Sequence, residues 1–177
     1  MVGNSGGLES MIRFKENFRG NEDDYETLIQ EYYNLFKIPG GKYVPPYESV
    51  YTDKKGLIMG PSTVATKKFY ARAGVEVSNE YKDLPDHIGL EQRFVSHLCD
   101  KELKCWIKGD AKGAMTLLAL QREFLNDHLM KWISEFRKKV EESTKNDFYK
   151  GITRLTEDLI KIDFEMISET LKHFQSL

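Results

Sequence analysis

Residues 83–98 read D-L-P-D-H-I-G-L-E-Q-R-F-V-S-H-L, and they decide the fold because a helix begins within them. Proline is tolerated in the first turn of a helix, where its missing N–H would have no partner, so Pro85 indicates a helix start. Either aspartate of the stretch can accept hydrogen bonds from the free N–H groups of that turn. His87 and Glu91 are one turn apart and therefore predicted to share a face. The pattern therefore predicts that the side chains of Asp86, His87 and Glu91 lie together at the point where a helix begins after a loop.

The same residues also fit purely structural roles. Asp86 can be a cap or a first-turn acid, and His87 can be a half-buried imidazole bonded to Glu91. His128, which falls on a predicted long helix, is interpreted as a structural histidine.

Helical periodicity covers most of the remaining chain, and no stretch is typical of a strand. Acidic residues follow Asn21 where the helix dipole favours them, and apolar residues recur every third or fourth position through residues 111–142. We therefore predict an all-α protein, a single globular bundle of six or seven or more helices in one domain of residues 1–177. Besides the helix begun in residues 83–98, the predicted helices are Leu8–Phe18, about Asn21 to Phe36, Gly60 to Gly74, about Ala111 to Glu142, and Asn146 or Gly151 to Phe174.

Residues 38–60 are predicted to form a long ordered loop. Two adjacent prolines exclude a helix interior or a central strand there. Three tyrosines and two valines in the same segment need apolar partners, so we expect the loop to pack over the body, with some of its aromatic side chains lining a cleft. The glycine-rich start, residues 1–7, is expected to be flexible.

Composition excludes several classes of function. The net charge of −2 over 177 residues does not suggest binding to nucleic acid or to an anionic membrane. No apolar run approaches the roughly 20 residues needed to cross a bilayer, and the start lacks the pattern of a secretory signal, so we expect a cytoplasmic protein without direct membrane insertion. Cys99 and Cys105 match neither a zinc pair nor a redox pair. No metal site and no cofactor are predicted.

Motifs for the commoner enzyme chemistries are also missing. The sequence contains no His-Glu-x-x-His, no G-x-x-x-x-G-K-[ST] phosphate loop, no G-x-G-x-x-G and no Gly-x-Ser-x-Gly. We therefore predict no catalytic residues. An aromatic loop combined with an acidic helix start suits peptide binding better than it suits catalysis.

Four short motifs then point to a known family. They are Tyr-Tyr-Asn-Leu-Phe at 32–36, Val-Pro-Pro-Tyr-Glu-Ser-Val-Tyr at 44–51, Met-Gly-Pro-Ser-Thr at 59–63, and Leu-Pro-Asp-His-Ile at 84–88 with Glu91 and Phe94. With these motifs in this order and at these separations, the chain resembles the TorD/DmsD/NarJ family of redox-enzyme maturation chaperones over roughly residues 32–98. The Leu-Pro pair directly before Asp86 is similar to the nitrate-reductase-like branch.

The resemblance implies a TorD-like, all-helical cytoplasmic chaperone that is not an enzyme. Such a protein binds the twin-arginine signal peptide or the apo-form of a molybdopterin oxidoreductase subunit, nitrate reductase being one example. It assists cofactor insertion and assembly before export. The implied partner is the apo molybdoenzyme catalytic subunit or its signal peptide, and the chaperone itself is expected to be a monomer or a homodimer.

The peptide-binding residues expected from this resemblance form an apolar groove with an acidic edge. The groove would hold the hydrophobic part of the leader, and Asp86, helped by Glu48 or Glu91, would face its arginine pair. The expected set is Leu35, Phe36, Pro46, Tyr47, Glu48, Tyr51, Pro85, Asp86, His87 and Glu91.

Two other functions stay open at this point. The first is a metal-dependent hydrolase or nucleotide-binding enzyme that uses Asp86, His87 and Glu91. It would need further clustered acids or histidines, which the sequence does not provide. The second is a helical assembly subunit without a peptide groove, in which every tyrosine of the loop would be buried.

Overall fold

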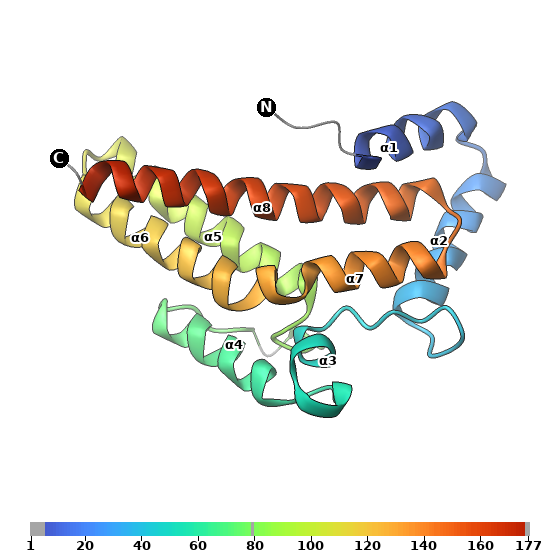
Figure 1. Ribbon diagram of the computed structural model, residues 1–177, viewed down its shortest axis with the longest axis horizontal. Coiled ribbons are helices and arrows are strands. Elements are labelled where there is room, and N and C mark those ends of the chain that lie inside the picture. The colour runs from blue at the N-terminus through green and yellow to red at the C-terminus, as the bar shows by residue number, and fades with distance from the viewer. Residues whose placement is uncertain (1–5, 79, 176–177) are drawn as a thin grey trace. The chain divides into compact units, whose positions relative to one another are not determined.

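The structure is a computed structural model that describes residues 6–78 and 80–175, and it is all-α as predicted (Figure 1). The long predicted helix is present as α6 and α7, joined without a break by one π-helical turn, η2. Counting these three as one continuous helix gives seven helices among the described residues. The elements are α1 (Gly6–Asn17), α2 (Glu22–Phe36), α3 (Glu48–Thr52), η1 (Lys54–Gly56), α4 (Pro61–Arg72), α5 (Ile88–Ile107), α6 (Ala111–Phe124), η2 (Leu125–Leu129), α7 (Met130–Ser143) and α8 (Asp147–Gln175).

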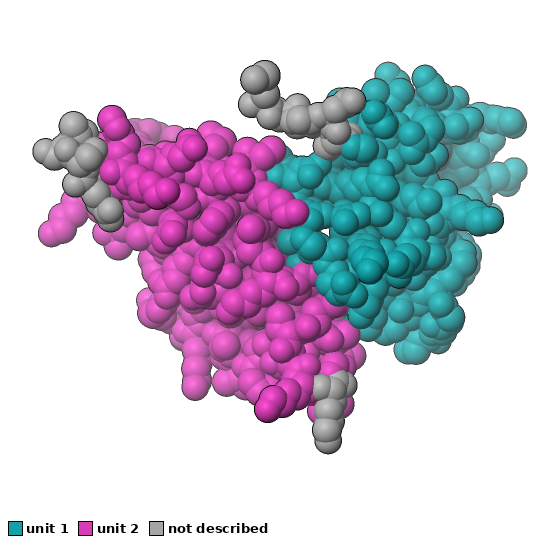
Figure 2. All heavy atoms as spheres, viewed as in Figure 1, with its two compact units in different colours: residues 1–46, 133–159 teal, residues 47–132, 160–177 magenta. Residues whose placement is uncertain are grey.

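The chain forms two compact units, drawn in different colours in Figure 2. Unit 1 comprises residues 1–46 and 133–159, and unit 2 comprises residues 47–132 and 160–177. The boundaries fall inside α7 and α8, so each of these helices contributes to both units. The single domain expected for residues 1–177 stays a prediction.

Unit 1 is held by aromatic packing and by capped helices. Asn21 caps α2 by accepting a hydrogen bond from the Asp24 N–H, as the sequence indicates. Phe36 packs against Phe136 and Tyr149, with ring centroids 6.1 and 5.9 Å away, and the Tyr149 hydroxyl donates to a carbonyl of α2. These contacts fix α2 against α7 and the start of α8.

The glycine at position 151 allows α1 to lie very close to α8. A Cβ on Gly151 of α8 would come within 2.8 Å of the Met11 side chain of α1, which is closer than real Cβ contacts. Of the segment expected to be flexible, residues 1–7, Gly6 and Gly7 belong to α1, and Gly7 is buried. The rest of that segment, residues 1–5, lies outside the described residues.

Unit 2 has an aromatic core between α4, α5 and α6. Phe94 of α5 is in contact with Tyr70 and Phe124, at centroid separations of 4.5 and 4.7 Å, and Phe69 lies 5.1 Å from Phe124. All four rings are buried. Through the Tyr70 hydroxyl, which donates to the Pro85 carbonyl, this core is joined to the segment where residues 47–49 and 84–88 meet.

Two predicted boundaries differ from the structure. The loop predicted over residues 38–60 contains a five-residue helix, α3, followed by the short 3₁₀ turn η1. The helix predicted to start at Pro85 starts at Ile88 instead, so neither Asp83 nor Asp86 is its cap. The cap is His87, whose Nδ1 accepts a hydrogen bond from the Gly89 N–H at 3.0 Å. Within the described residues no helix is long and apolar enough to cross a membrane.

Candidate functional site

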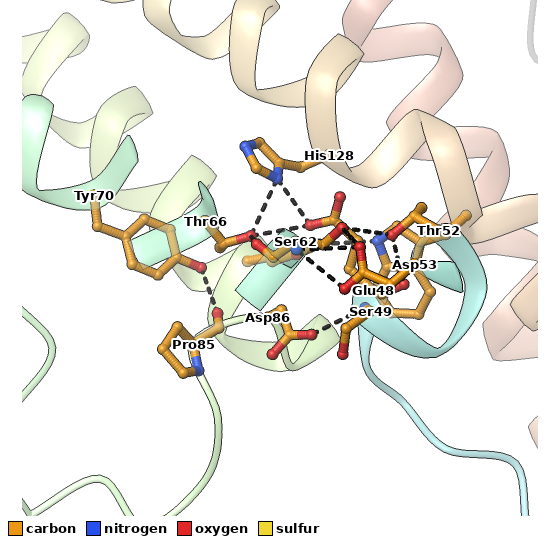
Figure 3. A network of polar contacts seen from close by, with 12 residues as sticks. Glu48, Ser49, Thr52, Asp53, Ser62, Thr66, Tyr70, Pro85, Asp86 and His128 are labelled. Carbon is orange, nitrogen blue, oxygen red and sulfur yellow. Dashed lines mark hydrogen bonds and ion pairs between the residues drawn. The ribbon is translucent and has the colours of Figure 1, made fainter. Parts of the chain in front are cut away.

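The site is built where the segment entering α3 lies beside the segment entering α5. Tyr47 and His87 form an isolated antiparallel β-bridge, and the Glu48 N–H donates to the Asp86 carbonyl at 3.0 Å. One carboxylate oxygen of Asp86 accepts the Ser49 N–H, also at 3.0 Å (Figure 3). Because α3 has no side-chain cap of its own, Asp86 supplies an acceptor to its free N–H groups from 37 residues away. Asp86 was considered as a cap of α5, but its carboxylate accepts a hydrogen bond from α3 instead.

A small surface rim lies outside this pairing. The Tyr47 hydroxyl donates to Asp83 Oδ1 at 2.7 Å, and the Tyr47 and His87 rings meet edge to face at 5.4 Å. His87 Nε2 is 3.9 Å from Asp83 Oδ2, and the two side chains are 20% and 25% exposed. Water and solutes therefore have access to an aromatic ring, an imidazole and a carboxylate at one place. We call these three residues the rim.

The three acids expected at the edge of the groove are buried in this structure, and the contact of Asp86 with the arginine pair of a leader stays a prediction. Asp86 is 0% exposed, as is Glu91, and Glu48 is 2% exposed. The carboxylate that remains accessible beside them is Asp83.

The buried acids gather in the interior of unit 2 with a histidine from η2. His128 donates its Nδ1–H to Glu48 Oε2 at 2.8 Å, and the Thr66 hydroxyl lies 3.0 Å from the same oxygen (Figure 3). Glu91 Oε2 accepts the indole N–H of Trp132 at 3.2 Å. One donor atom each of Glu48, Glu91 and His128 lies within 4.8 Å of the others. We call these three residues the buried cluster.

Burial changes the acid–base properties of this region. The pKa of Glu91 is raised well above its ordinary value, first because burial disfavours the charged form and then because of the negative charge of Glu48. A proton on Glu91 also allows a hydrogen bond to Glu48, whereas without it Glu91 Oε1 has no donor. Burial, followed by the charge of Glu91, likewise raises the pKa of Tyr70, whose hydroxyl donates to the Pro85 carbonyl at 2.9 Å.

The structure brings together seven of the ten predicted site residues in unit 2. Tyr47 and His87 belong to the rim, Glu48 and Glu91 to the buried cluster, and Asp86 lies between them. Tyr51 stacks on Trp132 at 5.3 Å, and Pro85 accepts from Tyr70. The other three, Leu35, Phe36 and Pro46, are in unit 1, where Leu35 and Pro46 are buried. Their place beside the seven stays a prediction.

Sequence reasoning missed several members of the site. Asp83 was considered only as a cap, His128 as a structural histidine and Trp132 as one of the apolar residues of the long helix, and Thr66 was not singled out. Only the fold brings Glu48 and His128 together, since they are 80 residues apart. The one available signal was Trp132, because a buried indole N–H usually requires an acceptor.

Comparison with known proteins places the chain in a family. The family model described as nitrate reductase delta subunit matches residues 5–138, more than half of the chain. The chain belongs to this family. The match confirms the resemblance stated for residues 32–98 and extends it in both directions, into α1 and through α6.

Three relatives carry informative names. The chain is 29% identical over 152 residues to "Chaperone protein TorD" of Shewanella pealeana, covering 81% of this chain and 62% of the relative. It is 24% identical over 131 residues to "Probable Tat proofreading chaperone DmsD" of Haemophilus influenzae, covering 74% and 57%. It is 29% identical over 119 residues to "Selenate reductase assembly chaperone protein" of Thauera selenatis, covering 66% and 59%.

The chain therefore spans about three fifths of the length of these relatives. Their names describe chaperones, which agrees with the prediction of a protein that is not an enzyme and does not support a metal-dependent hydrolase using Asp86, His87 and Glu91.

Proposed function

We propose that this chain is a cytoplasmic chaperone for the catalytic subunit of a molybdopterin oxidoreductase, and that it binds the subunit's twin-arginine leader before export. Membership in the nitrate reductase delta subunit family supports this proposal, as do relatives named for Tat proofreading and for assembly of selenate reductase. The observation that carries it is the pairing of the α3 and α5 entry segments, which presents Tyr47, Asp83 and His87 at the surface over a fixed base.

The rim has the chemistry to recognise arginine. A guanidinium presents several N–H donors in a plane and forms charge-assisted hydrogen bonds with a carboxylate, which Asp83 offers. The neighbouring Tyr47 ring can stack on the guanidinium. Because Asp83 is only 25% exposed, its bond to arginine is screened less by water than that of a fully exposed acid.

Apolar side chains beyond α3 offer contacts for the hydrophobic part of a leader. Leu57, Ile58 and Met59 are exposed on the loop that follows η1. Asp53 ties the ends of this loop by accepting the Ser62 N–H and hydroxyl, so the apolar tip is held on a closed base. An apolar tip and an acidic rim on the same compact unit offer the two kinds of contact that a peptide with arginines followed by a hydrophobic stretch would need.

Calorimetric titration with twin-arginine leaders of molybdoenzymes tests this function. We expect binding of a leader with its arginine pair, and binding weakened about tenfold or more when both arginines are lysines, because lysine lacks the planar fork.

Tyr47→Ala should weaken binding by about 2 kcal/mol, as expected for an aromatic anchor. Asp83→Asn should weaken it about tenfold and largely remove the preference for arginine over lysine, because the charge-assisted bond is lost.

Asp100→Asn is the matched control, since Asp100 is an exposed acid in the middle of α5. It should bind the leader as the unsubstituted protein does, and circular dichroism should show all variants to be equally helical. Equal affinity for the arginine and lysine leaders, or full binding by both rim variants, would contradict the proposal.

A further inference from the structure

We propose that the buried cluster of Glu48, Glu91 and His128 binds a divalent transition-metal ion of the zinc type. The sequence predicts no metal site, and this inference does not depend on leader binding. It rests on the donor set, the buried carboxyl groups, one carboxylate oxygen that accepts no hydrogen bond, and the position of His128.

The donor set suits such an ion. One imidazole nitrogen and two carboxylate oxygens are a mixed nitrogen and oxygen set, which zinc and its neighbours in the first transition row accept and which leaves a position for water. The donor atoms lie within 4.8 Å of one another. With bonds of roughly 2.0–2.2 Å, ligands around one zinc ion are within about 4 Å of each other, so small side-chain rotations suffice.

The charge of the cluster calls for a cation. Glu48, Glu91 and Asp86 are three buried carboxyl groups in one region, and among the described side chains the one basic group paired with any of them is the His128 imidazole beside Glu48. A carboxylate removed from water without a counter-charge is strongly disfavoured. A divalent ion bound by Glu48 and Glu91 would displace the proton held on Glu91 and compensate both carboxylate charges.

One oxygen of the cluster accepts no hydrogen bond. Glu91 is fully buried and no donor faces its Oε1, whereas its Oε2 accepts the Trp132 indole N–H. Once an ion displaces the proton that Glu91 shares with Glu48, the carboxylate is held at one oxygen and can coordinate the ion through the other. The Thr66 hydroxyl orients Glu48 in the same way.

His128 connects the cluster to the surface. It lies in the π-helical turn η2, a deviation that is common at functional positions, and Nδ1 faces Glu48 while the other ring nitrogen points away from the cluster (Figure 3). His128 also lines an open hollow of about 480 Å³ that carries both acidic and basic side chains. The imidazole therefore lies between the cluster and this hollow. For Nδ1 to bind an ion, the neutral ring carries its proton on Nε2 instead.

Metal titration of the purified full chain tests this site. After treatment with EDTA and desalting, the protein is titrated with Zn²⁺ by calorimetry, and its metal content is measured by mass spectrometry. We expect one bound ion per chain, with an affinity at least about 100-fold lower in Glu91→Gln and in His128→Gln. Thermal unfolding should shift upward with Zn²⁺ in the unsubstituted chain but not in these variants.

The matched control is the double variant His97→Gln, Cys99→Ser, which removes two possible donors on the exposed face of α5. It should retain the ion. The unsubstituted chain loaded with Co²⁺ provides a measurement that needs no variant, and its absorption should lack thiolate charge-transfer bands. The proposal is overturned if no stoichiometric ion binds, if Glu91→Gln binds normally, or if the control loses the ion.

Discussion

Replacing Trp132 by alanine is expected to lower the free energy of unfolding by about 3–5 kcal/mol, the range found when large aromatic residues are removed from a core. Trp132 is 0% exposed and is among the largest fully buried side chains of the chain. It stacks on Tyr51 of α3 and donates its indole N–H to Glu91. Alanine would leave a cavity beneath α3 and would also remove a hydrogen bond from a buried carboxyl group.

Urea denaturation followed by circular dichroism measures this effect. Trp132→Phe is the informative partner variant, because it keeps an aromatic ring against Tyr51 and removes only the N–H and part of the volume. We expect its loss of stability to lie between zero and that of the alanine variant. A loss below about 1 kcal/mol for Trp132→Ala would mean that the ring contributes little to the core.

Replacing Glu91 by glutamine is expected to change how stability depends on pH. Since the pKa of Glu91 is raised in the folded state above its ordinary value of 4.5, the folded protein holds a proton that the unfolded chain releases. The full stability is then present below about pH 4.5 and is lost as the pH rises toward the raised pKa. Glu91 contributes a slope of up to about −1.4 kcal/mol per pH unit in that window.

Glutamine does not titrate, so Glu91→Gln should lack this slope and gain stability relative to the unsubstituted protein as the pH rises. Urea denaturation at several pH values in the presence of EDTA measures the difference, with Glu135→Gln as a control because Glu135 is exposed on α7. Parallel stability curves for the Glu91 variant and the unsubstituted protein would contradict the raised pKa.

The helices that sequence alone predicts well are those with local signals. The α2 start follows from Asn21 and the acids after it, and the continuous helix from α6 to α7 follows from its regular apolar spacing. The five residues of α3 make little more than one turn, which is too short for a periodic pattern to be recognised. Its acceptor, Asp86, comes from a distant segment that a local pattern cannot reveal.

The error at the start of α5 has the same origin. Asp83 and Asp86 are both reasonable caps by local rules, but each is engaged elsewhere, Asp83 by the Tyr47 hydroxyl and Asp86 by α3. His87 then takes the cap position. The sequence could not show that His87 is partly exposed and Glu91 buried, because the two residues are one helical turn apart and were predicted to share a face. Motif order, by contrast, was sufficient to predict the family.

Hydrogen–deuterium exchange with and without a twin-arginine leader tests the central claim most directly, because it locates the bound peptide on the chain. The account predicts slower exchange in residues 47–52 and 83–91 with the arginine leader, and little change when both arginines are lysines. Unchanged exchange in both segments at a saturating concentration of the arginine leader, or protection confined to other parts of the chain, would contradict it.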